Sequence, residues 1–283
     1  MGKISAVLRL TRIEHSLMLV FAVLAAELIT KGLPSANYLA LSFITPIFIS
    51  MGSFAINDYF DVEVDKANKK MRPLVTGELS RSSALYLTFV FMAIGIISSA
   101  LINFYCFVIA IIFAAFSLMY SYRIKELPLA GNSYIAFSMA IPFIFGSYVV
   151  SGDLRPSIIL VFIMIFLSGI AREIHGTIRD YEGDVKMRKA KTLPGVIGKK
   201  NSAVFALLLY LVAIFISFYL FAYIAPFRLN YVYLAIIMIS DILLFYVSYG
   251  CLEVSNRKFY EKSRNISLMS MALALIALIL APL

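Results

Sequence analysis

Long apolar runs constrain the fold of this chain more than any other feature. A run of roughly 17–25 apolar residues is long enough to cross the hydrocarbon core of a bilayer as a helix. With 61% hydrophobic residues and a mean hydropathy of +0.90, the chain is not a soluble globular protein. No linker or compositional break divides it, so we predict one all-α membrane domain over residues 1–283. Its nine expected transmembrane helices cover residues 15–33, 37–57, 83–103, 105–122, 130–150, 156–174, 202–224, 232–250 and 266–282.

The distribution of basic residues predicts how the chain lies in the membrane. The net charge of +9 could suggest nucleic acid as a partner, but the 25 Lys and Arg are not spread evenly. With the amino terminus inside, all except Lys31, Arg155 and Arg228 lie in inner segments. This is the positive-inside pattern. We therefore predict a multi-pass protein of the cell membrane with a cytoplasmic amino terminus, whose partner is the bilayer and not nucleic acid.

Two groups of aspartates follow apolar runs on the predicted cytoplasmic side. The first is Asp58, Asp61 and Asp65, whose spacing of i, i+3, i+7 places all three on one helical face. The second is Asp180 and Asp184, at i, i+4. Acidic residues at the edge of a bilayer are costly, so they indicate a functional site.

The surroundings of the two groups form a weak internal repeat, in which a helix is followed by acids and then by bases. Four predicted helices separate the groups, which keeps both on the same membrane face. Such a repeat predicts that the two groups lie across a central cavity. The short basic and apolar stretch at residues 2–13 is either an interfacial helix or a basic flank.

Carboxylates in this arrangement suit Mg²⁺ and a diphosphate. Mg²⁺ takes oxygen ligands and combines one or two carboxylates with substrate phosphate oxygens. Nearby bases would neutralise the remaining phosphate charge, and Arg can contact phosphate in bidentate fashion. The candidate phosphate ligands are Arg72, Lys125, Arg179 and Lys191. The alternative is that the acids merely form ion pairs with loop bases at the membrane surface.

The motifs around these acids resemble those of the UbiA superfamily of intramembrane prenyltransferases. Asn57-Asp58-x-x-Asp61-x-x-x-Asp65, followed by Arg72-Pro73 and Gly77, is similar to its first signature. Asp180-x-x-x-Asp184, with Glu173 before it and Lys191-Thr192 after it, is similar to its second. The resemblance covers essentially the whole chain. It implies a helical bundle around a central cavity, with Mg²⁺ and a polyprenyl diphosphate between the two groups.

The resemblance also implies roles for individual residues. Those expected in catalysis are Asp58, Asp61, Asp65, Asp180, Asp184 and Lys125, and the five aspartates are also the expected Mg²⁺ ligands. Those expected to bind substrate are Asn57, Arg72, Tyr120, Arg123, Glu173, Arg179 and Lys191. Tyr120 and Lys125 are five residues apart where the family usually has four, and Glu173 replaces a more usual aspartate.

Among the members of that superfamily, the stretches 120–132 and 172–184 most resemble archaeal enzymes that act on a lipid-like phosphate acceptor. Those enzymes transfer a geranylgeranyl group to geranylgeranylglyceryl phosphate and so form the second ether bond of archaeal lipids. Further bases could bind the acceptor phosphate: Arg12, Arg123, Lys186 and Lys189. The alternative within the same reaction type is an aromatic acceptor, as in quinone synthesis. His15 or His175 could serve as a base for the acceptor, or could simply be hydrogen-bonded residues at the membrane interface.

Other classes of protein fit the sequence less well. A cation transporter would be expected to carry a chain of acids across the bilayer, and only Asp241 and Glu27 lie deep in predicted helices. A CDP-alcohol phosphotransferase would open with Asp-Gly-x-x-Ala-Arg, which is absent. No GxxxG face stands out, so no oligomeric state is predicted.

Overall fold

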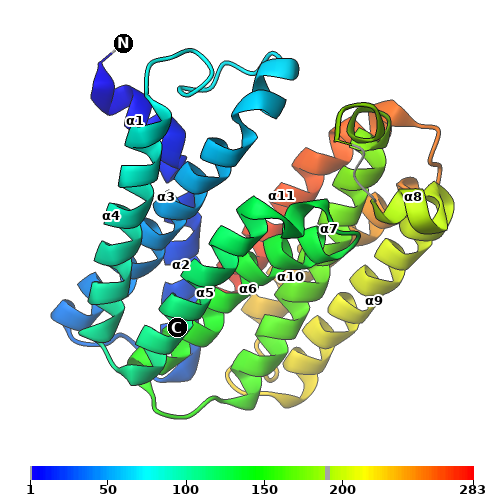
Figure 1. Cartoon of the computed structure of the whole chain (residues 1–283). Coiled ribbons are helices and arrows are strands. Elements are labelled where there is room, and N and C mark those ends of the chain that lie inside the picture. Colours follow the sequence, from blue (N-terminus) through cyan, green and yellow to red (C-terminus); the bar gives the residue numbers. More distant parts are fainter. Residues whose placement is uncertain (1, 189–191) are drawn as a thin grey trace. The chain divides into compact units, whose positions relative to one another are not determined.

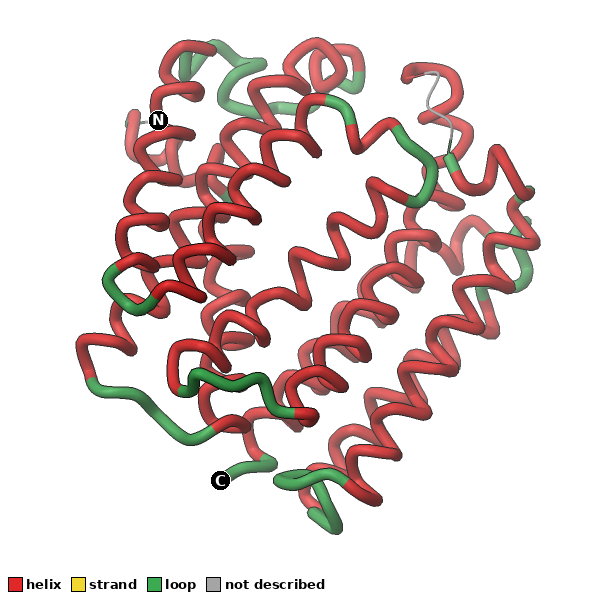
Figure 2. The backbone as a smooth tube through the Cα atoms, turned by 60° about the horizontal axis from the view of Figure 1, so that its bottom comes forward, coloured by secondary structure: helices red, strands yellow, loops and turns green. Residues whose placement is uncertain are grey.

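The structure is a computed structural model that describes residues 2–188 and 192–283, and over residues 182–191 no side chain is described. Every regular element in the described residues is helical (Figure 2). Among them are nine helices long and apolar enough to cross a membrane, which confirms the predicted all-α membrane fold. The chain divides into two compact units, one of Met1–Val23 and Leu33–Lys125 and the other of Leu24–Gly32 and Glu126–Leu283. The single domain predicted for residues 1–283 stays a prediction.

The first unit is organised around the long helix α3. Its elements are α1 (Lys3–Thr11), the first part of α2 (Ile13–Thr30), α3 (Ala36–Ala67), α4 (Arg81–Ala100) and α5 (Phe104–Tyr122) (Figure 1). Helices α1, α4 and α5 all pack against α3. A buried cluster joins Leu10 of α1 to Ala55 and Val62 of α3 and to Leu74 of the following loop. The stretch at residues 2–13 thus contains a helix, which buries Ala6 and Leu10 but leaves Ile4 and Leu8 exposed.

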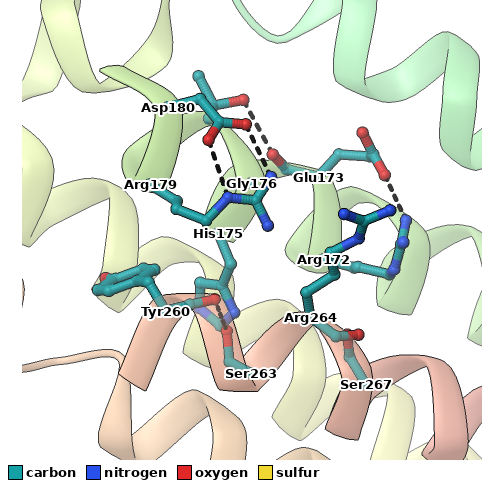
Figure 3. A pocket seen from close by; sticks show the side chains of 11 residues that line it. Arg172, Glu173, His175, Gly176, Arg179, Asp180, Tyr260, Ser263, Arg264 and Ser267 are labelled. Atoms are coloured by element: carbon teal, nitrogen blue, oxygen red, sulfur yellow. Dashed lines mark hydrogen bonds and ion pairs between the residues drawn. The ribbon is translucent and has the colours of Figure 1, made fainter. Parts of the chain in front are cut away.

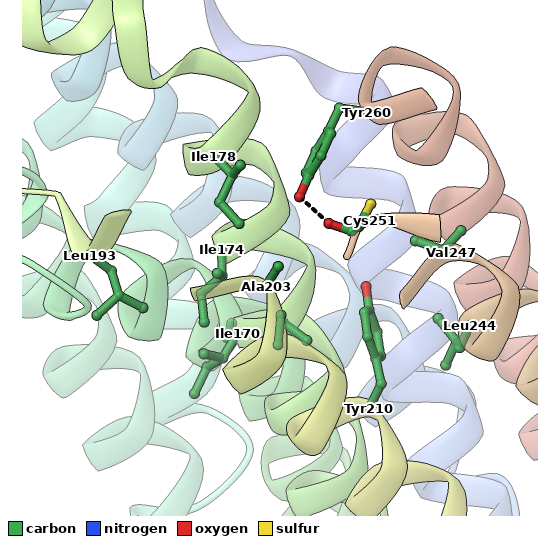
Figure 4. Close-up of a cluster of buried hydrophobic side chains, with 13 residues drawn as sticks. Ile170, Ile174, Ile178, Leu193, Ala203, Tyr210, Leu244, Val247, Cys251 and Tyr260 are labelled. Atoms are coloured by element: carbon green, nitrogen blue, oxygen red, sulfur yellow. Dashed lines mark hydrogen bonds between the residues drawn. The ribbon is translucent and has the colours of Figure 1, made fainter. Parts of the chain in front are cut away.

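The second unit contains the remaining helices. They are α6 (Ala130–Val150), α7 (Pro156–Arg188), α8 (Leu193–Ile197), α9 (Lys199–Tyr223), α10 (Tyr231–Gly250) and α11 (Arg257–Leu280), and the short 3-10 helix η1 (Ile124–Glu126) links the units. Helix α7 packs against α6, α9 and α11, and α10 packs against α9 and α11. The core of this unit gathers Ile174 of α7, Tyr210 of α9, Leu244 of α10 and Tyr260 of α11 (Figure 4). This packing holds the carboxyl-terminal part of α7, which carries the second group of acids.

Three helices are longer than the hydropathy predicts. Helix α3 continues to Ala67 instead of 57, α7 continues to Arg188 instead of 174, and α11 begins at Arg257 instead of 266. Apolarity marks the edge of the bilayer, whereas a helix continues until its backbone hydrogen bonds end. In α3 that point is Asn68, followed by Lys69 in the left-handed conformation (φ 53°). The first acidic group therefore lies within a continuous helix and not in a loop.

Close contact between α3 and α4 depends on Gly95. A Cβ at this position would lie 2.5 Å from Cγ1 of Ile49 and 3.0 Å from the backbone oxygen of Thr45. Small residues allow membrane helices to approach closely without a hydrophobic driving force. The missing side chain is thus part of the packing that holds α3 in place.

We expect Gly95→Ala to destabilise the first unit by about 1–3 kcal/mol, the usual effect of overpacking. A decrease in stability is informative because Gly→Ala in an unobstructed helix interior normally stabilises a protein by about 0.5–1 kcal/mol. Thermal unfolding in detergent measures the effect. Gly152→Ala, in the bend between α6 and α7, is the control for an added methyl group without contacts, since nothing lies within 4 Å of its added Cβ. A Gly95→Ala protein as stable as the wild type would contradict the tight packing.

Candidate active site

The first acidic group lies on one helix and is buried. Asp58, Asp61 and Asp65 all belong to α3, with relative exposures of 2%, 7% and 1%. Isolated carboxylates at such burial would be strongly disfavoured, so each requires a cation or a proton. The neighbouring residue Asn57 is half-buried on the same helix.

Asp58 is held by two arginines from different segments. Its Oδ1 accepts a hydrogen bond from Nη2 of Arg12 at 2.8 Å and another from Nη1 of Arg72. Arg12 lies between α1 and α2 in the left-handed conformation (φ 46°), with its guanidinium 4.8 Å from the centre of the Phe54 ring. Burial lowers the pKa of Arg12 below its ordinary value, and the charge of Asp58 opposes this effect. A guanidinium stays protonated in proteins, so Arg12 presents a positive charge to Asp58.

Lysines complete the neutralisation of the group. Nζ of Lys125, in η1, donates a hydrogen bond to Oδ1 of Asp61 at 2.6 Å. Oδ1 of Asp65 lies 3.0 Å from Nζ of Lys70, and its Oδ2 lies 2.9 Å from Nη1 of Arg72. These two distances are those of ion pairs, but neither has hydrogen-bond geometry. The structure therefore brings the predicted Asp58, Asp61, Asp65, Arg72 and Lys125 together.

Two bases of this group have contacts that the sequence does not indicate. Lys70 pairs with Asp65, and its only sequence signal is its place in the basic loop after α3. Arg12, a candidate for binding an acceptor phosphate, contacts Asp58 in the structure, and its contact with phosphate stays a prediction. The choice of partner depends on how α1 packs on α3, and the two residues are 46 positions apart.

Two further predicted residues lie at the carboxyl end of α5. Tyr120 is half-buried within the helix, and Arg123 is exposed at its carboxyl end. Arg123 makes no ion pair with any residue that the structure describes. Its predicted contact with substrate stays a prediction, as does that of Tyr120.

The oxygen-rich donor set of the first group fits Mg²⁺. The described residues hold no cluster of three or more Asp, Glu, His or Cys poised around one point. Mg²⁺ does not require one, because it commonly uses one or two carboxylates together with substrate oxygens and water. Three carboxylates face four bases here: Arg12, Lys70, Arg72 and Lys125. A cation could thus bind to the carboxylates of this group while its basic side chains bind an anion.

The second acidic group lies toward the carboxyl end of α7. Asp180 accepts a bidentate pair of hydrogen bonds from Arg179, at 2.8 Å from Nε and 2.7 Å from Nη2. About two helical turns earlier, Nη1 of Arg172 donates a hydrogen bond to Oε1 of Glu173 at 2.6 Å. Asp184 and Lys191, both predicted site residues, lie outside the residues whose side chains the structure describes, as do Lys186 and Lys189.

A pocket of about 380 Å³ opens beside this group, between α7 and α11 (Figure 3). Its α7 wall carries Arg172, Glu173, His175, Gly176, Thr177, Arg179 and Asp180, and its α11 wall carries Tyr260, Ser263, Arg264 and Ser267. None of the α11 residues was predicted, and Tyr260, Ser263 and Arg264 lie before residue 266, where that helix was expected to begin. Their one sequence signal is the basic character of the segment before it.

His175 is the most unusual residue of this pocket. Only 4% of it is exposed, and its ring is flanked by the rings of Tyr210 at 5.7 Å and Tyr260 at 6.0 Å. Neither ring nitrogen has a hydrogen-bond partner in the part of the chain that the structure describes. Buried polar atoms are rarely left in this state, so the imidazole is a candidate for contact with a ligand.

Comparison with known proteins now decides the family. The UbiA prenyltransferase family model matches residues 18–271, which is most of the chain. The chain belongs to the UbiA prenyltransferase family. Its relatives include the digeranylgeranylglyceryl phosphate synthases of Archaeoglobus fulgidus, 37% identical over 96% of this chain and 94% of that protein, and of Thermococcus kodakarensis, 30% identical over 98% of each.

Solved structures agree with this assignment. A structure of digeranylgeranylglyceryl phosphate synthase is 28% identical and superposes with a TM-score of 0.83 over 100% of this chain and 99% of its own. A UbiA homologue from Archaeoglobus fulgidus, bound to GPP and Mg²⁺, has the same fold at 22% identity, with a TM-score of 0.67 over 97% of this chain and 99% of its own. The predicted resemblance to the UbiA superfamily is thus confirmed, and this UbiA-family protein is a prenyltransferase and not a transporter or a CDP-alcohol phosphotransferase.

Proposed function

We propose that this protein transfers a geranylgeranyl group from its diphosphate to geranylgeranylglyceryl phosphate, forming the second ether bond of an archaeal membrane lipid. The observation that carries this function is the nearly full-length similarity to digeranylgeranylglyceryl phosphate synthases, at 30% and 37% identity. In this reaction the allylic C–O bond to diphosphate breaks and a bond forms between that carbon and the acceptor hydroxyl oxygen. The hydroxyl proton is released, and diphosphate leaves.

We infer that Mg²⁺ assists the departure of diphosphate. Support comes from the UbiA homologue solved with GPP and Mg²⁺ and from the buried carboxylates of α3. The proposed Mg²⁺ ligands are Asp58, Asp61, Asp65, Asp180 and Asp184. When bound, the metal would neutralise charge that develops on the leaving group.

The bases of the first acidic group would then bind phosphate oxygens. Arg72 pairs with Asp58 and Lys125 pairs with Asp61, and both aspartates are proposed Mg²⁺ ligands. The two basic groups are therefore within reach of a diphosphate bound to that metal. Guanidinium suits bidentate contact with phosphate, and ammonium acts as a point charge. Substrate contacts are also proposed for Asn57, Tyr120, Arg123, Glu173, Arg179 and Lys191.

The distribution of Lys and Arg supports a cytoplasmic site. Each acidic group follows an apolar span, and the segment after each group is rich in Lys and Arg. We propose that both phosphorylated lipids bind with their charged groups at this inner membrane face.

Product formation tests the proposal. Purified protein in lipid vesicles receives geranylgeranyl diphosphate, geranylgeranylglyceryl phosphate and Mg²⁺, and the lipid product is identified by mass spectrometry. A doubly prenylated glyceryl phosphate is expected. Prenylation of an aromatic acceptor in place of the glyceryl phosphate would show that the acceptor is wrong, and absence of any prenyl transfer would overturn the proposed reaction.

A further inference from the structure

The α11 wall of the pocket carries a guanidinium and no carboxylate. Tyr260, Ser263, Arg264 and Ser267 line it. Tyr260 donates its hydroxyl proton to the backbone oxygen of Cys251, Ser263 donates to that of Tyr260, and Ser267 donates to that of Arg264. These three hydroxyls therefore already have acceptors, which leaves Arg264 as the donor that this wall presents to the pocket.

The charges of the pocket are not balanced. Arg172 is paired with Glu173 and Arg179 with Asp180. Arg264 forms no ion pair with any described residue, and Figure 3 shows its side chain extending from α11 beside Arg172. Two guanidinium groups in one pocket repel each other unless an anion lies between them. The lining residues, three arginines and two carboxylates, thus favour an anionic ligand.

His175 gives independent support for a ligand here. Its buried ring lines the same pocket, and both of its nitrogens lack partners. A neutral imidazole offers one N–H donor and one acceptor. A phosphate oxygen could accept from the donor, and a hydroxyl group of the ligand could donate to the other nitrogen.

We propose that this pocket binds the phosphate monoester of the glyceryl phosphate acceptor, with Arg264 as a specificity-determining residue and His175 as a hydrogen-bond donor. This inference rests on the proposed function and names the site for one of its two substrates. The donor diphosphate must leave, so its charge calls for a metal at carboxylates. The acceptor phosphate stays attached throughout the reaction and needs recognition only, which a carboxylate-free wall with arginine can provide without a metal.

Kinetics of Arg264→Gln test this site. We expect the KM for geranylgeranylglyceryl phosphate to rise by about tenfold or more, as for the loss of a charged hydrogen bond, while the KM for geranylgeranyl diphosphate stays within about twofold of wild type. Arg257→Gln is the matched control. It removes an arginine from the same helix, but its side chain is 78% exposed and it pairs with Glu261 outside the pocket.

A neutral acceptor separates phosphate recognition from a structural effect. With geranylgeranylglycerol, which lacks the phosphate, Arg264→Gln should react at the wild-type rate. An equal loss of activity with both acceptors would overturn the inference. A rise in the KM for the donor, in place of the KM for the acceptor, would also overturn it. The second case would assign the pocket to the diphosphate.

A binding measurement keeps this inference distinct from the proposed function. Wild-type protein that forms no ether product refutes the proposed function. Binding of geranylgeranylglyceryl phosphate to wild type, Arg264→Gln and His175→Phe is then measured directly by thermal stabilisation. Weaker binding by Arg264→Gln and His175→Phe, but not by Arg257→Gln, supports the phosphate site even without turnover. Equal binding by all four proteins overturns it.

Discussion

Replacing Asp61 with asparagine is expected to lower turnover by about 100-fold or more, the order of loss when a preorganised stabiliser of transition-state charge is removed. Asp61 is buried, and its Oδ1 lies 2.6 Å from Nζ of Lys125. Asparagine keeps the shape and one oxygen that can still accept from Lys125, but it loses the charge that Mg²⁺ requires. Steady-state rates at saturating concentrations of both substrates measure the change.

A neighbouring residue offers a control for Asp61→Asn. Glu63 lies two positions away on α3, but its side chain is 69% exposed and pairs with Lys66 and Arg81 at the surface. Glu63→Gln therefore removes one negative charge from the same helix without touching the buried group. Its turnover should stay within about twofold of wild type, since surface ion pairs contribute little. Equal activity of Asp61→Asn and Glu63→Gln would refute a catalytic role for the buried carboxylate.

Loss of folding must also be separated from loss of chemistry. Removing one partner of a buried ion pair can cost about 3–5 kcal/mol, because the other charge is left alone. The double variant Asp61→Asn/Lys125→Gln removes both charges. If its stability returns toward wild type while its turnover stays low, the defect lies in catalysis.

The first acidic group shows how far the sequence predicts a site. The spacing of Asp58, Asp61 and Asp65 predicts a shared helical face, and the structure has all three buried on α3. Lys125 was also predicted, by the resemblance to the family, from its place after the fourth predicted transmembrane helix. The pairing of Asp58 with Arg12 could not be predicted, because it depends on the packing of a short helix that no local pattern specifies.

The second unit shows where prediction from hydropathy ends. Arg264 was counted only among the inner bases that topology explains. Because α11 begins nine residues earlier than its apolar run, Arg264 lies on a helix that faces α7 and not in a loop. Beyond the bilayer edge a helix is stabilised by packing against other helices. Hydropathy does not detect this packing. The same reason accounts for the extension of α3 and α7.

Removal of divalent cations is expected to abolish turnover and to leave the protein folded. The leaving diphosphate needs positive charge, so the reaction should fall to background in EDTA and return when Mg²⁺ is added. The fold should not depend on the metal, since Asp58, Asp61 and Asp65 already have basic partners without it. Turnover and thermal unfolding are measured on the same EDTA-treated sample.

The two readouts distinguish a catalytic metal from a structural one. A catalytic Mg²⁺ predicts lost turnover with an almost unchanged unfolding temperature, whereas a structural metal would lower both together. Adding diphosphate with Mg²⁺ should raise the unfolding temperature of the wild type more than either does alone, because metal and anion share the site. In Asp61→Asn this combined effect should be much smaller, and in Glu63→Gln it should remain. Full turnover in EDTA would show that the buried aspartates serve only their ion pairs with Arg12, Arg72, Lys70 and Lys125.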